Sequence, residues 1–188
     1  MDFIEQVRQS KDLSKVKIGR DIIVIGGGMT AIDAAIQAKL LGAQNVTICY
    51  RRGPEQMGAS KFEQDLATSK GVMIRHWLAP KKVRSKKGAV KGLKLEFTRL
   101  SNGKLEKTGE KTSLNADQIF VAIGQRLDAG SLQKLQISSG RIKTDEMGKT
   151  SLSKVWAGGD CIEGGEDLTV TAVANGRDAA EDINAALS

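Results

Sequence analysis

The fold of this chain is decided by residues 20–41, which read RDIIVIGGGMTAIDAAIQAKLL. The apolar, β-branched run at 22–25 is typical of a parallel strand that is covered on both faces. From residue 30 the composition and spacing indicate a helix, and Gly42 stands where that helix would end. The stretch therefore predicts a buried strand, a glycine turn and a helix.

The glycine turn carries the pattern G-x-G-x-x-A. Gly26 permits a tight turn, Gly28 lets the backbone approach a pyrophosphate, and Ala31 keeps the helix close to the strand. The free N–H groups and the positive end of the helix form an anion site. Glycine-rich turns also occur where no ligand binds, but here a strand precedes the turn and a helix follows it, which predicts a dinucleotide-binding site.

The end of the second strand indicates which dinucleotide binds. Residues 45–50, NVTICY, read as a strand, and an NAD site usually ends this strand with an Asp or Glu for the ribose 2′-hydroxyl. This chain continues with Arg51 and Arg52 instead. Two guanidinium groups favour a 2′-phosphate through charge-assisted hydrogen bonds, so the sequence predicts NADPH. The alternative is that both arginines are solvated loop charges.

Composition and charge limit the class of protein. The chain has 188 residues, of which 40% are hydrophobic and 27% charged, as expected for a water-soluble globular protein. No apolar run approaches the ~20 residues that a membrane span needs, and no signal-peptide pattern is present, so we expect a cytoplasmic protein without membrane contact. The net charge is +7, but the basic cluster at 81–87 has no interleaved aromatic residues, so we expect no nucleic-acid partner.

Few residues suggest metal binding or acid–base chemistry. Cys49 and Cys161 are too far apart in sequence for a disulfide framework or for metal-ligand spacing. His76 is the only histidine, and we interpret it as structural because it follows a strand and has no partner nearby in sequence. We therefore nominate no metal ligand. Glu63 and Lys61 are acid–base candidates, but we interpret them as a helix cap and a surface charge and nominate no catalytic residue.

Further elements follow the same α/β pattern. Residues 2–9 resemble a short amphipathic helix, the capping box at 60–63 starts a helix that ends at Gly71, and residues 72–75 form a third strand. The resulting β-α-β-α-β order is the first half of a doubly wound sheet.

The second half of the chain has a different texture. We predict an antiparallel meander over 80–114, with a hairpin signal in the Asn-Gly pair at 102–103. A further buried strand is predicted over 117–123, a short strand over 155–157 and a final helix over 168–187.

Three segments together resemble a known family: residues 26–53, GGGMTAIDAAIQAKLLGAQNVTICYRRG; 122–125, AIGQ; and 150–183, TSLSKVWAGGDCIEGGEDLTVTAVANGRDAAEDI. They are similar to FAD- and NADPH-dependent oxidoreductases of the pyridine nucleotide-disulfide-like group. These oxidoreductases are related to the glutamate synthase small subunit and to the NADPH half of dihydropyrimidine dehydrogenase. The resemblance implies an α/β fold in which a linker helix (1–19) precedes a Rossmann-like NADPH-binding domain (20–125). That domain combines a parallel sheet with the meander, and the C-terminal part of a split FAD-binding domain (126–188) follows it.

The resemblance also assigns cofactor-binding residues by motif. NADPH would be held by residues of the glycine turn, the arginine pair and the strand end, which are Gly26, Gly27, Gly28, Met29, Thr30, Ala31, Arg51, Arg52, Ala122, Ile123 and Gly124. FAD would be held by a Gly-Asp pair and by the start of the last helix, which are Gly159, Asp160, Thr169 and Val170. Position 29 is often Asn in this family, and Met29 keeps the turn while altering one contact.

The resemblance implies hydride transfer from NADPH to FAD, followed by electron transfer to iron–sulfur clusters and a second catalytic subunit. In this family an N-terminal part with a cysteine-rich iron–sulfur segment and an FAD strand–turn–helix precedes the NADPH domain, and nothing before Met1 corresponds to it. We therefore expect a fragment that does not retain FAD, since FAD and the iron–sulfur clusters belong to the intact protein. The predicted strand at 155–157 would be an unpaired edge, which favours pairing with another chain, including a homodimer.

Two other interpretations compete with this one, and the first of them is disfavoured. A disulfide reductase of the thioredoxin reductase type has a similar layout but carries a C-x-x-C dithiol, which this sequence lacks. A non-enzymatic NADPH-binding regulatory module would use Gly159 and Asp160 only structurally. The final substrate also stays open between glutamate synthesis and pyrimidine reduction.

Overall fold

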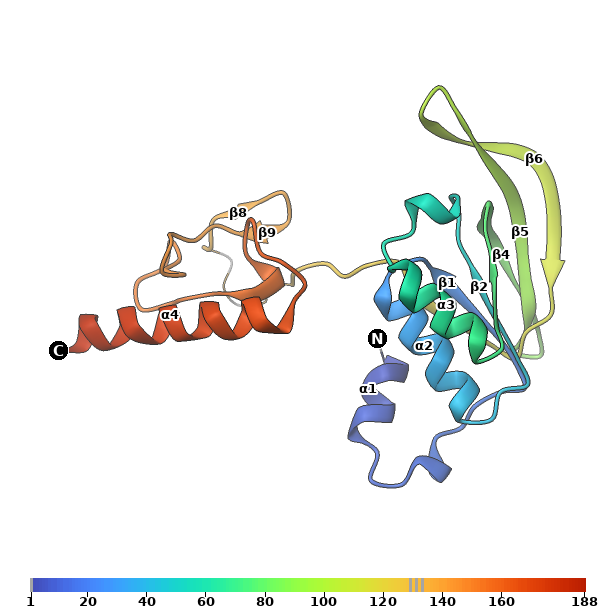
Figure 1. Ribbon diagram of the computed structural model, residues 1–188, viewed down its shortest axis with the longest axis horizontal. Helices are drawn as coiled ribbons and strands as arrows, with labels where there is room; N and C mark the ends of the chain where they lie inside the picture. The colour runs from blue at the N-terminus through green and yellow to red at the C-terminus, as the bar shows by residue number, and fades with distance from the viewer. Residues whose placement is uncertain (1, 129, 131, 133) are drawn as a thin grey trace. The chain divides into compact units, whose positions relative to one another are not determined.

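The computed structural model describes residues 2–128, 130, 132 and 134–188, and it divides the chain into two compact units (Figure 1). Unit 1 is Met1–Gly124 and unit 2 is Gln125–Ser188. Residues 1, 129, 131 and 133, which fall within the predicted linker and C-terminal segments, lie outside the described residues. All residues predicted to bind NADPH belong to unit 1, and all those predicted to bind FAD belong to unit 2.

Unit 1 is built on a four-stranded parallel sheet in the order β3-β2-β1-β7. Its elements are α1 (Asp2–Gln9), β1 (Asp21–Gly26), α2 (Met29–Leu40), β2 (Asn45–Cys49), α3 (Lys61–Ser69), β3 (Val72–Arg75) and β7 (Gln118–Ala122). Single turns of 3-10 helix, η1 (Leu13–Lys15) and η2 (Pro54–Gln56), lie in the connections. The predicted strand–turn–helix and the β-α-β-α-β order are confirmed.

Strand β1 sends its side chains alternately into two separate cores. Ile22 and Val24 pack in a cluster with the alanines of α2, whereas Ile23 and Ile25 pack in a second cluster with Cys49 and the leucines of an antiparallel sheet. Successive side chains of a strand point to opposite faces, so a continuous apolar run requires a cover on each face. Helices supply one cover and the antiparallel sheet supplies the other (Figure 1).

The antiparallel sheet consists of β4 (Leu78–Lys86), β5 (Ala89–Ser101) and β6 (Lys104–Leu114). Both hairpins turn at two residues with positive φ, Lys87 and Gly88 in the first and Asn102 and Gly103 in the second. Positive φ at both turn positions matches the twist of the flanking strands. The predicted meander is confirmed, and its Asn-Gly pair lies at a hairpin turn.

Strand β7 is an edge strand, which corrects the prediction of a buried strand over 117–123. Among the described residues β7 pairs with β1 alone, and Val121 and Ile123 are 57% and 73% exposed. Helix α1 adds a partial cover, because the Phe3 ring stacks on the Phe120 ring with centroids 4.3 Å apart. The apolar pattern identified the strand but overstated its burial, since one edge of β7 has no neighbouring strand.

Unit 2 has little regular structure before its C-terminal helix. It contains the two-residue strands β8 (Ile137–Ser138) and β9 (Arg141–Ile142), the turn η3 (Gly159–Cys161) and the helix α4 (Thr169–Leu187). The predicted final helix is confirmed. Among the described helices, α4 included, none is both long and apolar enough to cross a bilayer.

The predicted strand at 155–157 is wrong. Trp156 forms a single bridge with Lys149, and its indole Nε1 donates a hydrogen bond to Asp182 Oδ2 of α4 at 2.7 Å. The Thr150 amide donates to the Val155 carbonyl oxygen at 2.9 Å, and the Ala157 amide donates to the Gly148 carbonyl oxygen at 2.8 Å. The segment therefore forms an isolated antiparallel bridge with residues 148–150 and not a strand of a sheet. One side of the segment is thus paired within unit 2, and the homodimer stays a prediction.

Candidate functional site

The turn after β1 requires glycine at its first position. Gly26 has a φ of +154°, and a Cβ atom there would lie 2.2 Å from the carbonyl oxygen of Ala122 and 3.1 Å from Cβ of Ala31. Gly26 is also the register partner of Ala122 between β1 and β7. β1, β7 and α2 can therefore approach one another this closely only because glycine has no side chain.

Gly28 differs from Gly26 because the space beside it is open. It is the N-cap of α2 with a φ of −95°, and a Cβ atom there would have no neighbour within 4 Å. Its carbonyl oxygen accepts from the amides of Ala31 and Ile32, at 3.0 and 3.3 Å. No described residue accepts from the amides of Met29 and Thr30. Two free amides at a helix start, next to an open glycine, are the groups with which helix N-termini bind anions such as a pyrophosphate.

Tyr50 joins this turn to the loop that follows β2. A Cβ atom on Gly27 would lie 2.5 Å from the Tyr50 ring, so the ring sits directly against the backbone of the turn. The Tyr50 hydroxyl donates to the carbonyl oxygen of Gln56, and the Ala59 amide donates to the Gly27 carbonyl at 3.0 Å. The loop after β2 is thereby fixed beside the glycine turn.

Arg51 and Arg52 begin this loop. Arg51 is exposed and Arg52 half-buried, and neither guanidinium forms an ion pair with a residue that the structure describes. Their backbone carbonyl oxygens accept hydrogen bonds from Thr98 and Trp77. Sequence reasoning missed both of these donors, because nothing in a strand pattern marks them. Two unpaired cations on a fixed backbone suit a phosphate group.

The carboxyl ends of β1, β2 and β7 bring these parts together. Ile25 pairs with Cys49, and Gly26 pairs with Ala122, so the glycine turn, the arginine loop and residues 122–124 leave the sheet at the same edge. Ligands of open parallel sheets bind outside the carboxyl ends of the strands. The structure therefore gathers at one edge all the residues that the sequence predicted for NADPH.

The residues predicted for FAD come together within unit 2. The Gly159 amide donates to Asn175 Oδ1 of α4 at 3.0 Å, and Gly159 is buried with a φ of +76°. Asp160 follows it and is exposed, as are Thr169 and Val170 at the start of α4. The Gly-Asp turn is therefore anchored on the helix whose first amides were predicted to face the flavin.

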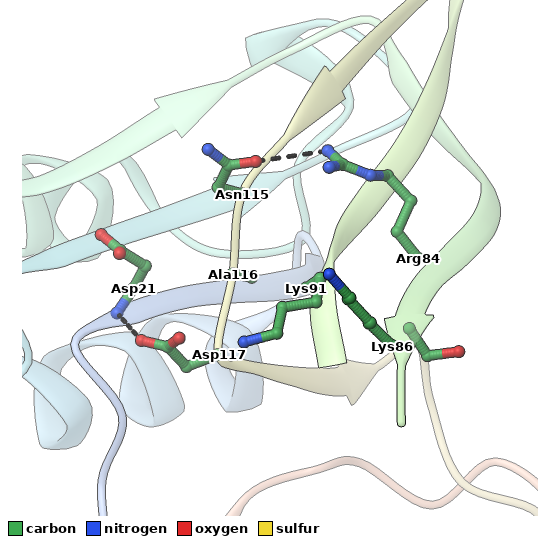
Figure 2. A pocket seen from close by; sticks show the side chains of 8 residues that line it. Asp21, Arg84, Lys86, Lys91, Asn115, Ala116 and Asp117 are labelled. Atoms are coloured by element: carbon green, nitrogen blue, oxygen red, sulfur yellow. Dashed lines mark hydrogen bonds between the residues drawn. The ribbon is translucent and has the colours of Figure 1, made fainter. Parts of the chain in front are cut away.

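A hollow of about 580 Å³ lies at the opposite edge of the parallel sheet, where β1 and β7 begin (Figure 2). Arg84 donates to Asn115 Oδ1 at 3.2 Å, and the backbone amide of Asp21 donates to Asp117 Oδ2 at 3.0 Å. Figure 2 also shows Lys91 extending toward Asp117. Charges of both signs line this hollow, so it lacks the uniformly positive surroundings that a dinucleotide's phosphates favour.

Burial shifts the pKa of two titratable side chains of unit 1, Cys49 and His76. Burial raises the pKa of the Cys49 thiol to about 11, which keeps it protonated and unreactive. Burial also lowers the pKa of His76, whose Nε2 lies 3.2 Å from the thioether sulfur of Met57. Within the part of the chain that the structure describes, no group of three or more His, Cys, Asp or Glu could hold a metal ion.

Comparison with known proteins identifies the family. Residues 1–176 match the family model described as pyridine nucleotide-disulphide oxidoreductase. The chain belongs to this family. The predicted resemblance to an oxidoreductase family is confirmed.

Curated relatives in the family include both of the types that the sequence resembled. The NAD-dependent dihydropyrimidine dehydrogenase subunit PreT of Escherichia coli (strain K12) is 32% identical over 184 residues, which cover 98% of this chain and 40% of that protein. The glutamate synthase [NADPH] small chain of the same strain is 33% identical over 181 residues, covering 88% and 38%. The chain thus spans about two fifths of the length of these relatives.

Solved structures show the same fold. Thioredoxin reductase from T. acidophilum superposes with a TM-score of 0.78 at 21% identity, covering 93% of this chain and 55% of that chain. Thioredoxin reductase from Lactococcus lactis (FR conformation) gives 0.74 at 26% identity, covering 90% and 53%. The predicted α/β fold class is confirmed, and it is the fold of thioredoxin reductase-type flavoproteins.

Proposed function

We propose that unit 1 binds NADPH and that the intact protein uses it to reduce FAD. One juxtaposition carries the proposal: the open glycine and free amides at the start of α2 lie beside two arginines that have no ion-pair partner among the described residues. The amides of Met29 and Thr30 suit the pyrophosphate, and Arg51 and Arg52 suit a 2′-phosphate. Residues 122–124 would line the nicotinamide side.

The choice of NADPH rests on the arginine pair. The names of the two relatives give different nucleotides, NAD for the dihydropyrimidine dehydrogenase subunit and NADPH for the glutamate synthase chain. A charge-assisted hydrogen bond contributes roughly 1.5–3 kcal/mol, which is roughly a 10- to 100-fold preference for each arginine that reaches a 2′-phosphate. Either guanidinium is enough to favour NADPH over NADH.

In unit 2 we propose that the turn at Gly159 and Asp160 and the first amides of α4 contribute to an FAD site. The bond from the Gly159 amide to Asn175 holds this turn on the helix and leaves Asp160 free to accept from a ribityl or sugar hydroxyl. The exposed residues Thr169 and Val170 would present backbone N–H groups to the flavin. When bound, the cofactors supply hydride chemistry, and this chain supplies binding and orientation.

Beyond FAD, we propose that electrons pass to iron–sulfur clusters and a second catalytic subunit in a cytoplasmic complex of the glutamate synthase or dihydropyrimidine dehydrogenase type. The names of the relatives support this, because they are a subunit and a small chain of such enzymes. A further relative, 31% identical over 198 residues, is the NADP(+)-dependent formate dehydrogenase subunit beta of Moorella thermoacetica.

The test is a titration of the chain with NADPH and with NADH, in the wild type and in Arg51→Ala/Arg52→Ala. We expect the wild type to prefer NADPH by at least about 10-fold, and the double variant to lose about 100-fold in NADPH affinity with little change for NADH. Isothermal titration measures both dissociation constants directly.

A matched variant separates a specific phosphate contact from general attraction of a polyanion. Arg84→Ala/Lys86→Ala removes the same charge at the opposite edge of the sheet, so it should change NADPH and NADH binding alike and only slightly. Equal affinity of the wild type for the two nucleotides would refute the arginine clamp.

A further inference from the structure

The loop that carries the arginine pair is anchored by the antiparallel sheet. The hydroxyl of Thr98, on β5, donates to the carbonyl oxygen of Arg51 at 2.8 Å. The amide of Leu78, at the start of β4, donates to the carbonyl oxygen of Tyr50 at 2.9 Å. A sheet that contributes no predicted nucleotide contact therefore fixes the backbone from which the guanidinium groups extend.

Thr98 is a buried polar residue, only 6% exposed. The pairing of β5 with β6 shifts register between Glu96 and Thr98, which marks a bulge, and such bulges re-aim a side chain. The Thr98 amide donates to the carbonyl oxygen of Trp77 at 3.0 Å. A buried hydroxyl needs a hydrogen-bond partner, and the Arg51 carbonyl is the partner that this geometry gives it.

Trp77 adds a second anchor on the same loop. Its amide donates to the carbonyl oxygen of Arg52 at 3.2 Å. A Cβ atom on Gly53 would lie 2.7 Å from the Trp77 ring, so the ring packs directly on the residue after the arginines. Trp77 has a φ of +59°, a left-handed conformation that is strained for a non-glycine residue and persists only where its surroundings impose it. The bond from Thr98 to the Trp77 carbonyl is part of those surroundings.

We propose that Thr98 is a positioning residue that strengthens the preference of this chain for NADPH over NADH by holding the arginine pair. Its hydroxyl donates to the Arg51 carbonyl and so fixes the backbone of the arginine pair before the nucleotide binds. Less conformational entropy is then lost when the guanidinium groups bind a 2′-phosphate. The inference rests on the proposed function, because it requires that Arg51 and Arg52 contact that phosphate. Thr98 itself touches no part of the nucleotide in this proposal.

The experiment compares Thr98→Val with Thr98→Ser in the full chain, using NADPH and NADH as probes. Valine keeps the volume and removes the hydroxyl, whereas serine keeps the hydroxyl. We expect Thr98→Val to weaken NADPH binding by about three- to ten-fold, to change NADH binding by less than about two-fold, and so to lower the affinity ratio. Thr98→Ser should restore the wild-type ratio.

One further variant controls for the loss of a hydroxyl group, and a second replaces Thr98→Val if that variant does not fold. Thr150→Val removes a hydroxyl that donates to a backbone carbonyl, that of Val155, at the same 2.8 Å but in unit 2, so the ratio should stay at the wild-type value. Thermal melting of each variant checks that it is folded. If Thr98→Val does not fold, Thr98→Ala removes the same hydroxyl while leaving room for water, and the same fall in the ratio is expected.

Two results would overturn the inference and are distinguishable. If the wild type prefers NADPH and the folded Thr98→Val or Thr98→Ala variant keeps the full ratio, Thr98 has no role in specificity while the arginine clamp stands. If the wild type shows no preference for NADPH, the clamp itself is absent and both proposals fail together.

Discussion

Unit 1 and unit 2 differ in how they bury apolar side chains. In unit 1 both faces of the parallel sheet are covered, and residues such as Val24, Ile48 and Leu95 are fully buried. Among the described residues of unit 2, the buried apolar side chains are Leu135 and Ile142, each 7% exposed. Unit 1 therefore has an extensive hydrophobic core, whereas the described part of unit 2 has only a small one.

Helix α4 shows what this difference means for function. It has no buried residue, and Val170, Val173 and Leu187 are 75%, 68% and 79% exposed. Burial of apolar surface is the main favourable term in folding, and a unit with so small a core gains little from it. The residues proposed to bind NADPH therefore lie on a well-packed unit, whereas those proposed to bind FAD lie on a unit with few buried apolar side chains among its described residues.

The largest expected effect contrasts Ile48→Ala in unit 1 with Val173→Ala in unit 2. Ile48 is fully buried in β2, so its truncation should lower the free energy of unfolding by about 3 kcal/mol through lost burial and a residual cavity. Val173 lies on exposed α4, and its truncation should change stability by less than about 0.5 kcal/mol. Urea unfolding monitored by circular dichroism measures both changes in the free energy of unfolding. A large loss of stability in Val173→Ala would show that another surface covers α4 and would contradict the difference between the two units.

A second prediction separates the fold from the site within unit 1. Gly26→Ala places a Cβ atom 2.2 Å from the Ala122 carbonyl, so it should cost about 2 kcal/mol or more in stability. Gly28→Ala meets no atom within 4 Å and should cost less than about 1 kcal/mol as a changed N-cap. Its methyl group would nevertheless stand where a pyrophosphate approaches, so NADPH affinity should fall about ten-fold. If Gly28→Ala bound NADPH as tightly as the wild type, the proposal that the pyrophosphate binds at this turn would be wrong.

The smallest effect concerns a polar pair on the antiparallel sheet. Lys81 Nζ lies 2.9 Å from Glu96 Oε2, and this hydrogen bond lowers the pKa of Glu96 below its ordinary value. Because the pKa of Glu96 is lower in the folded than in the unfolded chain, its ionised form stabilises the folded state at pH values above the ordinary glutamate pKa. This stabilisation is lost as the pH falls through the lowered pKa. Glu96→Gln should therefore melt slightly below the wild type at neutral pH, and the two should converge in acid.

Glu106→Gln is the matched control for this pair. Its partner Arg99 lies 3.7 Å away and both side chains are largely exposed, so the substitution should leave the melting temperature unchanged at either pH. A gap between wild type and Glu96→Gln that persists unchanged in acid would show that packing, and not the ion pair, accounts for the effect.

Much of unit 1 was predictable because its signals are local. The capping box of α3 is an example, since the Ser60 amide donates to Glu63 Oε2 at 2.7 Å and the Glu63 amide donates to Ser60 Oγ at 3.2 Å. These contacts span three residues, so spacing alone reveals them. The interpretation of Glu63 as a helix cap is confirmed.

The errors arose where a segment's role depends on its neighbours. The apolar strand before Gly124 lies at an edge, and the segment around Trp156 joins α4 by a side-chain hydrogen bond. An apolar pattern reports that a segment prefers burial, but the covering element comes from elsewhere in the chain.

The strand–turn–helix at 20–41, the meander, the family and the arginines in place of the usual acidic residue could all be recognised from the sequence. Each of these follows from residues close together in the chain, whose spacing fixes local backbone geometry. Only the tertiary structure decided that Gly26 packs against Ala122 and that Thr98 holds the carbonyl of Arg51, a residue 47 positions away. Contacts between distant segments leave no periodicity in the sequence, because they form only once both sheets are stacked.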